Sequence, residues 1–525
     1  MKKRICSLLL ICSMLAGLLP QIVLPQAAAA DTTTAAKDGF GLPTEEVTGI
    51  TDKATLRNNP YGTLGWVPLF QNHELVVAGV DSDEFQTTYE GATNRKDNKG
   101  SQMSTFRWSN STAVGNAERI ATVAFDPNGT GKDEYIANLV FDKSSERLRL
   151  YVTNKDRRVS DVVQIGDGND TEYIKKLKFY QTRAMLSLAA GDFDGDGKDT
   201  LMIYTPGNNE KTDTVDSIKA YTFDSKNGTL NDGGRVINLG NVITATKDGK
   251  EVSGPEVLKA MLYHDGNGDN ELRAHLSVDM EVGDVDMDGI DELAMTVNVN
   301  DLKEKKYDGY TDYEKSYLTV YDYNDTSSWT QKLNEKLLNS NGGASGRARF
   351  AGVTIGYVSD APSGSMPPEV VAVGYYDKKN NYQDCDFDTS RLLAYSYRYS
   401  TKDKSWEKKF EATEVVTNGF TNTGTKGDDV QNPLAVAAVA ADGLNSQEYL
   451  FISGSMYQIG QRDGTKLKIL DGSGKGHDRW LGGRLINNSG ILDYAVGNFD
   501  GNQQGMEQVY YVEYRKQETF DKQFL

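Results

Sequence analysis

The segment LAAGDFDGDGKDTLMIY, residues Leu188 to Tyr204, decides the fold of this chain. A short apolar segment is followed by a loop with aspartates at alternate positions, Asp192, Asp194 and Asp196, and then by a second apolar segment. Two short apolar segments around a glycine-containing loop predict a β-hairpin. The second apolar run is nearly continuous, which is typical of a strand buried on both faces.

The same pattern returns along the chain. A clear copy, VGDVDMDGIDELAMTV, covers residues 282–297; a weaker one covers 123–137, and one with an enlarged loop covers 495–512. Three more copies keep the two strands and the acidic residue that opens the second strand, at 67–78, 352–373 and 436–452. The residues that mark these openings lie at positions 74, 134, 200, 292, 369, 448 and 507.

The spacing of these markers favours a propeller. They lie 59 to 92 residues apart, which leaves room for the four strands of a blade, although compact propeller repeats need only ~40 to 50 residues. Alternating apolar residues predict third strands at 148–152, 218–223, 318–323 and 393–399. We therefore predict an all-β fold, a seven-bladed β-propeller. A plain β-sandwich is the alternative, but it has no need of one acidic hairpin at blade-like intervals.

Helical patterns are few. Residues 255–263 begin with a proline suited to a first helical turn, and residues 329–338 end before an Asn-Gly-Gly sequence. Both segments fall in the excess length between markers. They predict minor helical insertions on a β scaffold.

The hairpin at Asp192 resembles the FG-GAP or VCBS repeat of integrin-like β-propellers. With its weaker copies, the resemblance covers nearly all of the chain after the N-terminal segment. It implies a propeller whose acidic loops bind calcium through the side chains at loop positions one, three, five and nine and the backbone carbonyl of position seven.

Carried onto this sequence, the pattern names two full sets of calcium ligands and one weaker set. The first set is Asp192, Asp194, Asp196, the Lys198 carbonyl and Thr200, and the second is Asp284, Asp286, Asp288, the Ile290 carbonyl and Glu292. The weaker set is Asp126, Asn128, Thr130, the Lys132 carbonyl and Glu134. The family has Asp at position nine, so Thr200 and Glu292 depart from it, and the neighbouring Asp199 or Asp291 is an alternative ligand.

The chemistry of these loops points to Ca²⁺ independently. Carboxylates at alternate positions of a tight turn repel one another unless a cation lies among them. Calcium accepts six to eight hard oxygen ligands with tolerant geometry, whereas transition metals favour the nitrogen or sulfur that these loops lack. The alternative is a solvated acidic hairpin, and for residues 498–502, where the spacing is altered, we prefer that interpretation.

The N-terminus resembles an export signal. Lys2, Lys3 and Arg4 precede an apolar run at residues 5–19, and an Ala-x-Ala cleavage site ends at Ala30. We therefore expect a secreted protein in three parts: a signal peptide at 1–30, a segment at 31–60 that could complete the last blade, and a propeller at 61–525. Prolines interrupt the apolar run, so we expect no retained membrane span.

Charge and motifs limit the function. The formal net charge of −18, which becomes more negative when the basic signal is removed, disfavours nucleic acid and anionic membranes as partners. No HExxH or G-x-S-x-G motif is present, and we predict no catalytic residue. The leading hypothesis is a recognition or scaffold module for an extracellular glycan or protein. The alternatives are a carbohydrate-active enzyme such as a polysaccharide lyase, or the first domain of a longer secreted protein.

Overall fold

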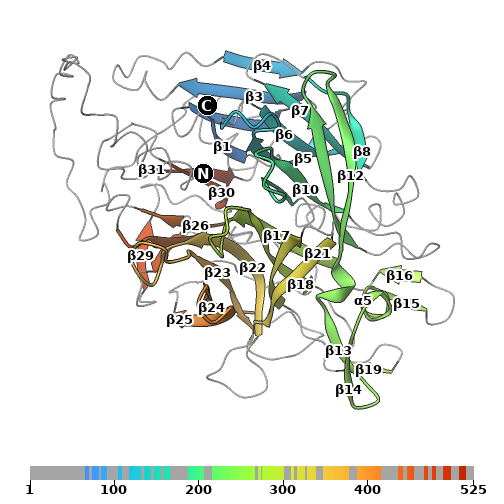
Figure 1. Ribbon diagram of the computed structural model, residues 1–525, viewed down its shortest axis with the longest axis vertical. Helices are drawn as coiled ribbons and strands as arrows, with labels where there is room; N and C mark the ends of the chain where they lie inside the picture. The colour runs from blue at the N-terminus through green and yellow to red at the C-terminus, as the bar shows by residue number, and fades with distance from the viewer. Residues whose placement is uncertain are drawn as a thin grey trace. The chain divides into compact units, whose positions relative to one another are not determined.

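Antiparallel β-sheets provide nearly all the regular structure in the described part of the chain (Figure 1). The computed structural model describes residues 65–69, 74–81, 84–91, 104–108, 117–131, 135–142, 147–154, 159–165, 187–205, 216–265, 270–272, 275–300, 309–311, 316–324, 328–337, 347–377, 387–415, 435–440, 446–453, 466–470, 476–480, 489–497 and 508–515. All of them belong to one contact-defined unit, residues 50–525. The predicted signal peptide and the segment 31–60 lie outside the described residues.

Six sheets have four strands each, and we number the main sheets in chain order. Sheet 1 contains β1 (Gly65–Leu69), β2 (Glu74–Asp81), β3 (Glu84–Gly91) and β4 (Ser104–Trp108). Sheet 2 contains β5 (Ala117–Phe125), β6 (Tyr135–Asp142), β7 (Arg147–Asn154) and β8 (Val163–Ile165). Sheet 3 contains β9 (Leu188–Gly191), β10 (Thr200–Thr205), β11 (Ser217–Asp224) and β12 (Thr229–Asn238).

The second half of the chain continues the series. Sheet 4 contains β17 (His275–Gly283), β18 (Glu292–Asn300), β20 (Ser316–Asn324) and β21 (Ser328–Lys336). Sheet 5 contains β22 (Arg347–Gly356), β23 (Glu369–Asp377), β24 (Phe387–Ser400) and β25 (Ser405–Val415). Sheet 6 contains β26 (Ala435–Val439), β27 (Tyr449–Ser453), β28 (Lys466–Leu470) and β29 (Gly476–Trp480), and sheet 7 has the described strands β30 (Ser489–Gly497) and β31 (Gln508–Arg515).

The order of strands is that of propeller blades. Within each main sheet, strands that follow one another in the sheet also follow one another in the chain, and all of them pair antiparallel. The first strand of each sheet contacts the first strand of the next, from β1 through β5, β9, β17, β22 and β26 to β30, and β30 contacts β1. The predicted β-propeller fold is confirmed on this order and these contacts.

Apolar side chains fill the spaces between consecutive sheets. All six residues of β10 are buried, as expected for a second strand covered on both faces. One buried cluster joins residues of sheets 2, 3 and 4, including Phe125, Met202 and Met295. A second joins sheets 4 and 5 and includes Val320 and Val370. Sheets 2 to 5 are therefore stabilised by packing on one another.

An insertion separates sheets 3 and 4 in the chain. It consists of the 3₁₀ helix η2 (Leu239–Asn241), strands β13 (Thr244–Lys247) and β14 (Lys250–Ser253), helix α5 (Pro255–Leu262), and the hairpin of β15 (Tyr263–Asp265) and β16 (Asn270–Leu272). Strand β19 (Tyr310–Thr311), which lies between β18 and β20 in the chain, pairs with β13. The predicted helix at 255–263 is confirmed as α5. In the described residues, no helix is both long enough and apolar enough to cross a membrane.

The second predicted helix, at 329–338, is wrong. These residues form most of β21, whose partner is β20. The four predicted third strands are confirmed within β7, β11, β20 and β24. The marker residues 74, 200, 292 and 369 do open second strands, whereas residue 448 lies directly before β27 and residue 507 directly before β31.

Candidate metal centre

Two acidic hairpins bring carboxylates together as the sequence predicts. The Asp192 loop (residues 192–199) joins β9 to β10, and the Asp284 loop (residues 284–291) joins β17 to β18. Carboxylate oxygens of Asp192, Asp194 and Asp196 lie within 4.8 Å of one another, and so do those of Asp284, Asp286 and Glu292. Asp288 does not belong to the second group, and Thr200 is a buried residue at the start of β10.

The turns are built by hydrogen bonds from backbone amides to the aspartates. Gly197 N donates to Asp192 Oδ2 at 2.9 Å, and Gly289 N donates to Asp284 Oδ2 at 3.2 Å. Both glycines have positive φ, 82° and 94°, a conformation that glycine adopts without a steric penalty. A sharp turn at the sixth loop position is therefore present in both hairpins.

Glu292 is the most deeply buried carboxyl group of the Asp284 site. Its side chain is 1% exposed, Oε2 accepts from Val285 N at 2.7 Å, and Oε1 has no hydrogen-bond partner among the described residues. Burial, followed by repulsion from Asp286, raises the pKa of the Glu292 carboxyl to about 9. A divalent cation among these oxygens would favour the ionised carboxylate and so oppose both causes of the shift.

The Asp192 loop is partly neutralised by the protein itself. Arg235 of β12 forms a close ion pair with Asp194, and its guanidinium lies 4.0 Å from the centre of the Tyr323 ring. Lys198 pairs with Asp196 at 3.0 Å on the surface. Asp192 is 9% exposed, and its Oδ1 has no hydrogen-bond partner among the described residues. The two loops thus differ in how much charge a bound cation would neutralise.

The weaker Asp126 loop is described only in part. Asp126 is buried, and its Oδ1 accepts from Asn128 N at 3.1 Å. Asn128 Oδ1 accepts from Ser225 Oγ at 2.6 Å, and Thr130 Oγ1 lies 3.4 Å from the Asp126 carboxylate. Lys132 and Glu134 lie outside the described residues, as does the loop at 498–502.

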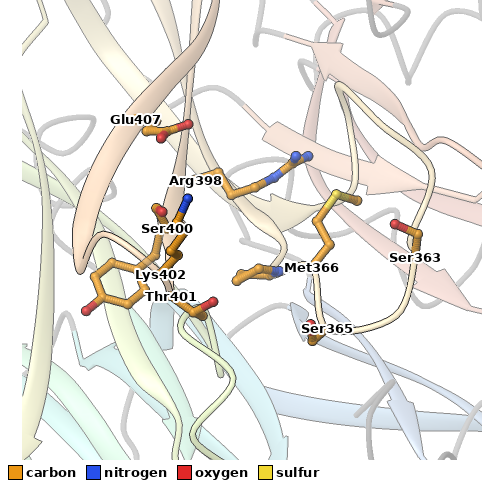
Figure 2. A pocket seen from close by; sticks show the side chains of 10 residues that line it. Ser363, Ser365, Met366, Arg398, Ser400, Thr401, Lys402 and Glu407 are labelled. Carbon is orange, nitrogen blue, oxygen red and sulfur yellow. The ribbon is translucent and has the colours of Figure 1, made fainter.

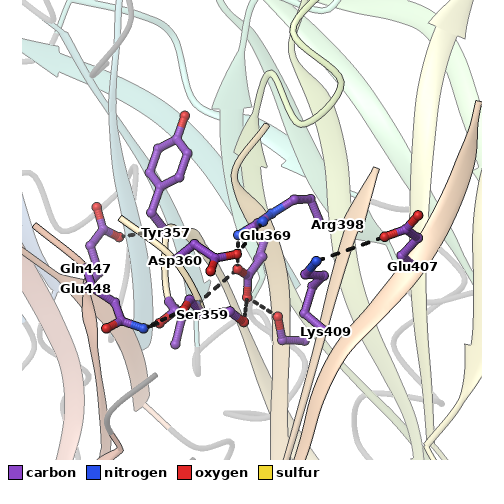
Figure 3. Close-up of polar contacts among 11 residues, drawn as sticks. Tyr357, Ser359, Asp360, Glu369, Arg398, Glu407, Lys409, Gln447 and Glu448 are labelled. Carbon is purple, nitrogen blue, oxygen red and sulfur yellow. Dashed lines mark hydrogen bonds and ion pairs between the residues drawn. The ribbon is translucent and has the colours of Figure 1, made fainter. Parts of the chain in front are cut away.

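Sheet 5 has a comparable loop whose cation is an arginine. Glu369 opens β23 opposite Gly356, as Glu292 opens β18 opposite Gly283. Glu369 is fully buried, and its carboxylate accepts from Ser359 N at 3.0 Å and from Ser359 Oγ at 2.8 Å. Arg398 forms a close ion pair with Glu369 and a second with Asp360 at 2.7 Å (Figure 3). The carboxylate at this position is therefore satisfied within the protein.

Three carboxylates that directly precede second strands join neighbouring sheets, and the sequence did not reveal these contacts. Asp199 Oδ2 accepts from Asp126 N at 2.7 Å, and Asp291 Oδ2 accepts from Asp192 N at 2.9 Å. Glu448 Oε2 accepts from Tyr357 N at 3.2 Å. Asp199 and Asp291 were the alternative calcium ligands of their own loops, but these contacts direct them to the preceding loop instead.

A polar pocket lies beside the arginine of sheet 5. Its volume is about 330 Å³. Figure 2 shows Ser400, the last residue of β24, with Thr401 and Lys402 after it, facing Ser363 and Ser365 of the loop before β23. The lining consists of Ser363, Ser365, Met366, Pro367, Arg398, Tyr399, Ser400, Thr401, Lys402 and Glu407. Hydroxyl and charged groups thus dominate this surface.

Comparisons with known proteins identify no family. No family model matches the chain, and no curated protein matches it. A mutant of AofleA from Arthrobotrys oligospora aligns at 10% identity and a TM-score of 0.35, over 88% of this chain and 92% of that one.

Two further solved structures are similarly distant. The β-propeller domain of the Trilobed protease from Pyrococcus furiosus has 9% identity and a TM-score of 0.34, over 87% and 92% of the two chains. The Nup133 β-propeller domain from Vanderwaltozyma polyspora has 8% identity and a TM-score of 0.36, over 84% and 92%. These likenesses are too distant to add to the fold argument, which depends on the strand order and contacts described above.

Proposed function

We propose that the chain is a secreted, calcium-binding, seven-bladed β-propeller of the FG-GAP/VCBS type. In this proposal it acts outside the cell as a recognition or scaffold module for a glycan or a protein. The series of contacts from β1 to β30 and back to β1 supports a closed ring of seven sheets. The signal-like residues 1–30 support export.

The observation that carries the calcium proposal is the difference between Glu292 and Glu369. Both residues open the second strand of a sheet at the same hairpin position, and both are buried. Glu369 has a guanidinium beside it, whereas no ion pair to Glu292 is present among the described residues. A buried carboxylate is costly unless a cation compensates it, and a bound cation would do for Glu292 what Arg398 does for Glu369.

Calcium fits the donors of the Asp284 loop better than other ions do. The cluster offers carboxylate oxygens from Asp284, Asp286 and Glu292, and backbone carbonyls and water would complete the six to eight ligands that Ca²⁺ prefers. Extracellular modules bind calcium with dissociation constants of roughly 10⁻⁴ to 10⁻³ M. Binding at that level stabilises the folded state by mass action.

The variant Glu292→Gln tests the calcium proposal. The Glu292 carboxyl has a pKa of about 9 and is already protonated near neutral pH without a cation, so the amide should leave stability in chelator almost unchanged. We expect the variant to lose the calcium-dependent rise in Tm that comes from this loop, which is worth about 2.7 kcal/mol when calcium is a hundredfold above Kd. Differential scanning calorimetry and calorimetric titration with CaCl₂ would measure both quantities.

A matched control is Glu369→Gln. This change leaves Arg398 without its buried partner, so it should lower Tm equally with calcium and with chelator. The calcium proposal fails if wild-type Tm and titration heats are indifferent to calcium, or if Glu292→Gln retains the full calcium response.

The pocket beside Arg398 is where we propose ligand contact. Hydroxyls of Ser363, Ser365 and Thr401 and the ammonium of Lys402 line it, and such groups hydrogen-bond sugar hydroxyls or polar protein surfaces. Screening the protein on glycan and matrix-protein arrays, with Lys402→Ala as the comparison, tests this. Release of unsaturated sugar products from an acidic polysaccharide would instead favour the enzyme hypothesis.

A further inference from the structure

Carboxylates that precede second strands form a repeated clasp between consecutive sheets. In each case the residue directly before the second strand of one sheet bonds twice to the residue directly after the first strand of the preceding sheet. Asp291 accepts from Asp192 N at 2.9 Å and donates its own amide to Asp192 O at 2.9 Å. Asp199 does the same with Asp126, at 2.7 and 2.9 Å.

The third clasp shows that this geometry does not depend on an acidic loop. Glu448 accepts from Tyr357 N at 3.2 Å and donates to Tyr357 O at 2.8 Å (Figure 3). Gln447 Nε2 adds bonds of 2.6 Å to the carbonyls of Val358 and Ser359. Here the clasped loop lies beside the ion pairs of Arg398 with Asp360 and Glu369 and has no cluster of three aspartates.

Close approach of the backbone is part of the clasp. A Cβ on Gly191 would lie 2.9 Å from Asp291 Oδ2, and a Cβ on Gly356 would lie 2.1 Å from Glu448 Oε2. At Gly283 the nearest atom would be Ile355 Cδ1 at 3.4 Å, and Pro368 stands where a clasp carboxylate would be in sheet 5. The Asp284 loop therefore differs from the Asp192 loop in having no carboxylate at the clasp position of the next sheet.

We infer that Asp291 is a positioning residue for the cation site of the preceding Asp192 loop, and that it acts across the sheet boundary. The inference rests on the proposed calcium binding. Asp192 occupies the first ligand position, and its carbonyl and amide are both held by Asp291. A bond that fixes the backbone of a ligand fixes the direction of its carboxylate, as outer partners do in other metal sites.

The position of Asp291 predicts which loop loses calcium affinity when its side chain is removed. Asp291 belongs to the Asp284 loop in sequence, so a purely local role would make its removal weaken calcium binding there. A clasp role makes removal weaken binding in the Asp192 loop, 99 residues away. The two roles therefore predict losses at different sites.

The experiment measures calcium affinity in full-length proteins in which only one of the two acidic loops keeps its ligands. Asp286→Asn with Glu292→Gln silences the Asp284 loop, and Asp194→Asn with Asp196→Asn silences the Asp192 loop. Asp291→Ala is then introduced into each background. We expect about a tenfold loss of affinity at the Asp192 loop and less than about a threefold change at the Asp284 loop, where only the nearby charge is altered.

Two variants separate positioning from general destabilisation. Asp291→Asn keeps an oxygen that can accept from Asp192 N, so it should retain most of the calcium affinity. If the alanine variant does not fold, Asp291→Ser replaces it, because the serine side chain is too short to reach Asp192 N. The comparison is then between Asp291→Asn and Asp291→Ser. Glu448→Ala breaks a clasp at a loop closed by Arg398. It should lower Tm without changing calcium affinity at the Asp192 loop.

Three results would overturn the inference: equal affinities with and without Asp291 at the Asp192 loop, a larger loss at the Asp284 loop, or the same loss from Glu448→Ala. If the Asp192 loop binds no calcium with Asp291 intact, the proposed function fails at that loop and the inference fails with it. That result is distinguishable from the other three because it appears before Asp291 is changed.

Discussion

Glu292 and Glu369 show how one backbone position can be used in two ways. Each opens the second strand of its sheet, and each is removed from water. Sheet 5 supplies Arg398, Ser359 and Ser396, so the charge of Glu369 is neutralised at the time of folding. Sheet 4 supplies three crowded carboxylates, and a cation from the medium would have to neutralise them. Folding at sheet 4 should therefore respond to the medium in a way that sheet 5 does not.

A half-buried acid in β17, Asp279, makes stability depend on pH. Asp279 of β17 accepts from Val353 N of β22 at 2.8 Å. Burial raises the pKa of Asp279 to about 7, against the opposing effect of hydrogen bonds from the Val353 and Met280 amides. In the folded state the carboxyl thus holds its proton to a higher pH than in the unfolded chain, where its pKa is 3.8.

We predict that Asp279→Asn flattens this dependence. Since the native state binds more protons between pH 3.8 and about 7, the contribution of Asp279 is fully present below that window and is lost as pH rises through it. The amide can still accept from Val353 N, so the variant should match wild type near pH 4 and exceed it by about 1 to 3 kcal/mol near pH 8. Urea unfolding at both pH values would measure this, and equal stability near pH 8 would contradict it.

At the scale of strands and loops, the sequence predicted the second and third strands because alternation and burial impose simple patterns. It failed at residues 329–338. Trp329, Leu333 and Leu337 are four residues apart, a spacing that places side chains on one face of a helix. A register shift in β21 separates Trp329 from the two leucines, so that Trp329 packs in the cluster shared with sheet 3, and Leu333 and Leu337 in the cluster shared with sheet 5. Contact across sheets favours the strand: Trp329 packs on Phe193 of sheet 3, with ring centres 5.3 Å apart, and on Tyr323 of its own sheet, at 5.2 Å.

The clasp carboxylates could not have been assigned from the sequence for a similar reason. Asp199 is 73 residues from Asp126, and Asp291 is 99 residues from Asp192. Considered within its own hairpin, each of these aspartates resembles an alternative calcium ligand next to loop position nine. Only the placement of consecutive sheets brings them to a partner. The carboxylates grouped within each acidic loop, by contrast, follow from local spacing, and the structure brings most of them together.

A glycine at the end of a first strand should be indispensable where a clasp closes over it. In Gly356→Ala the new methyl would meet Glu448 Oε2 at 2.1 Å and Ala438 Cβ at 2.5 Å. We predict a loss of about 2 to 4 kcal/mol in the free energy of unfolding, since overpacking and a displaced carboxylate add together. Guanidinium unfolding would measure it.

Gly283→Ala is the matched control. It stands at the end of the first strand of sheet 4, and its nearest contact would be Ile355 Cδ1 at 3.4 Å, so it should cost less than about 1 kcal/mol. Equal losses for the two glycines would contradict the role assigned to the clasp.

For the molecule as a whole, the dominant electrostatic fact is a formal net charge of −18. Like charges repel in the folded state, and the repulsion is screened by salt. We predict that the chelated protein gains Tm when NaCl rises from about 0.1 M to about 0.5 M. Millimolar CaCl₂ should raise Tm further, although it adds little ionic strength, because calcium binds to the acidic loops specifically.

Differential scanning fluorimetry with chelator, NaCl and CaCl₂ would separate the two contributions. MgCl₂ at the same concentration is the control, since magnesium requires a stricter octahedral geometry and releases water reluctantly. If NaCl alone reproduced the effect of calcium, general screening would be sufficient and specific sites would be unnecessary.

The position of Pro368 has a consequence for how the protein comes apart. If one sheet opens while its clasp partner stays folded, a desolvated carboxylate is left without its hydrogen bond. Clasped sheets should therefore open together. Sheets 2, 3 and 4 are linked in this way, and so are sheets 5 and 6. Between them, proline supplies neither the carboxylate nor the amide proton. Sheets 4 and 5 still share the Asp279–Val353 bond and an apolar cluster, so hydrogen exchange should find opening between β17 and β22 easier than opening between clasped sheets.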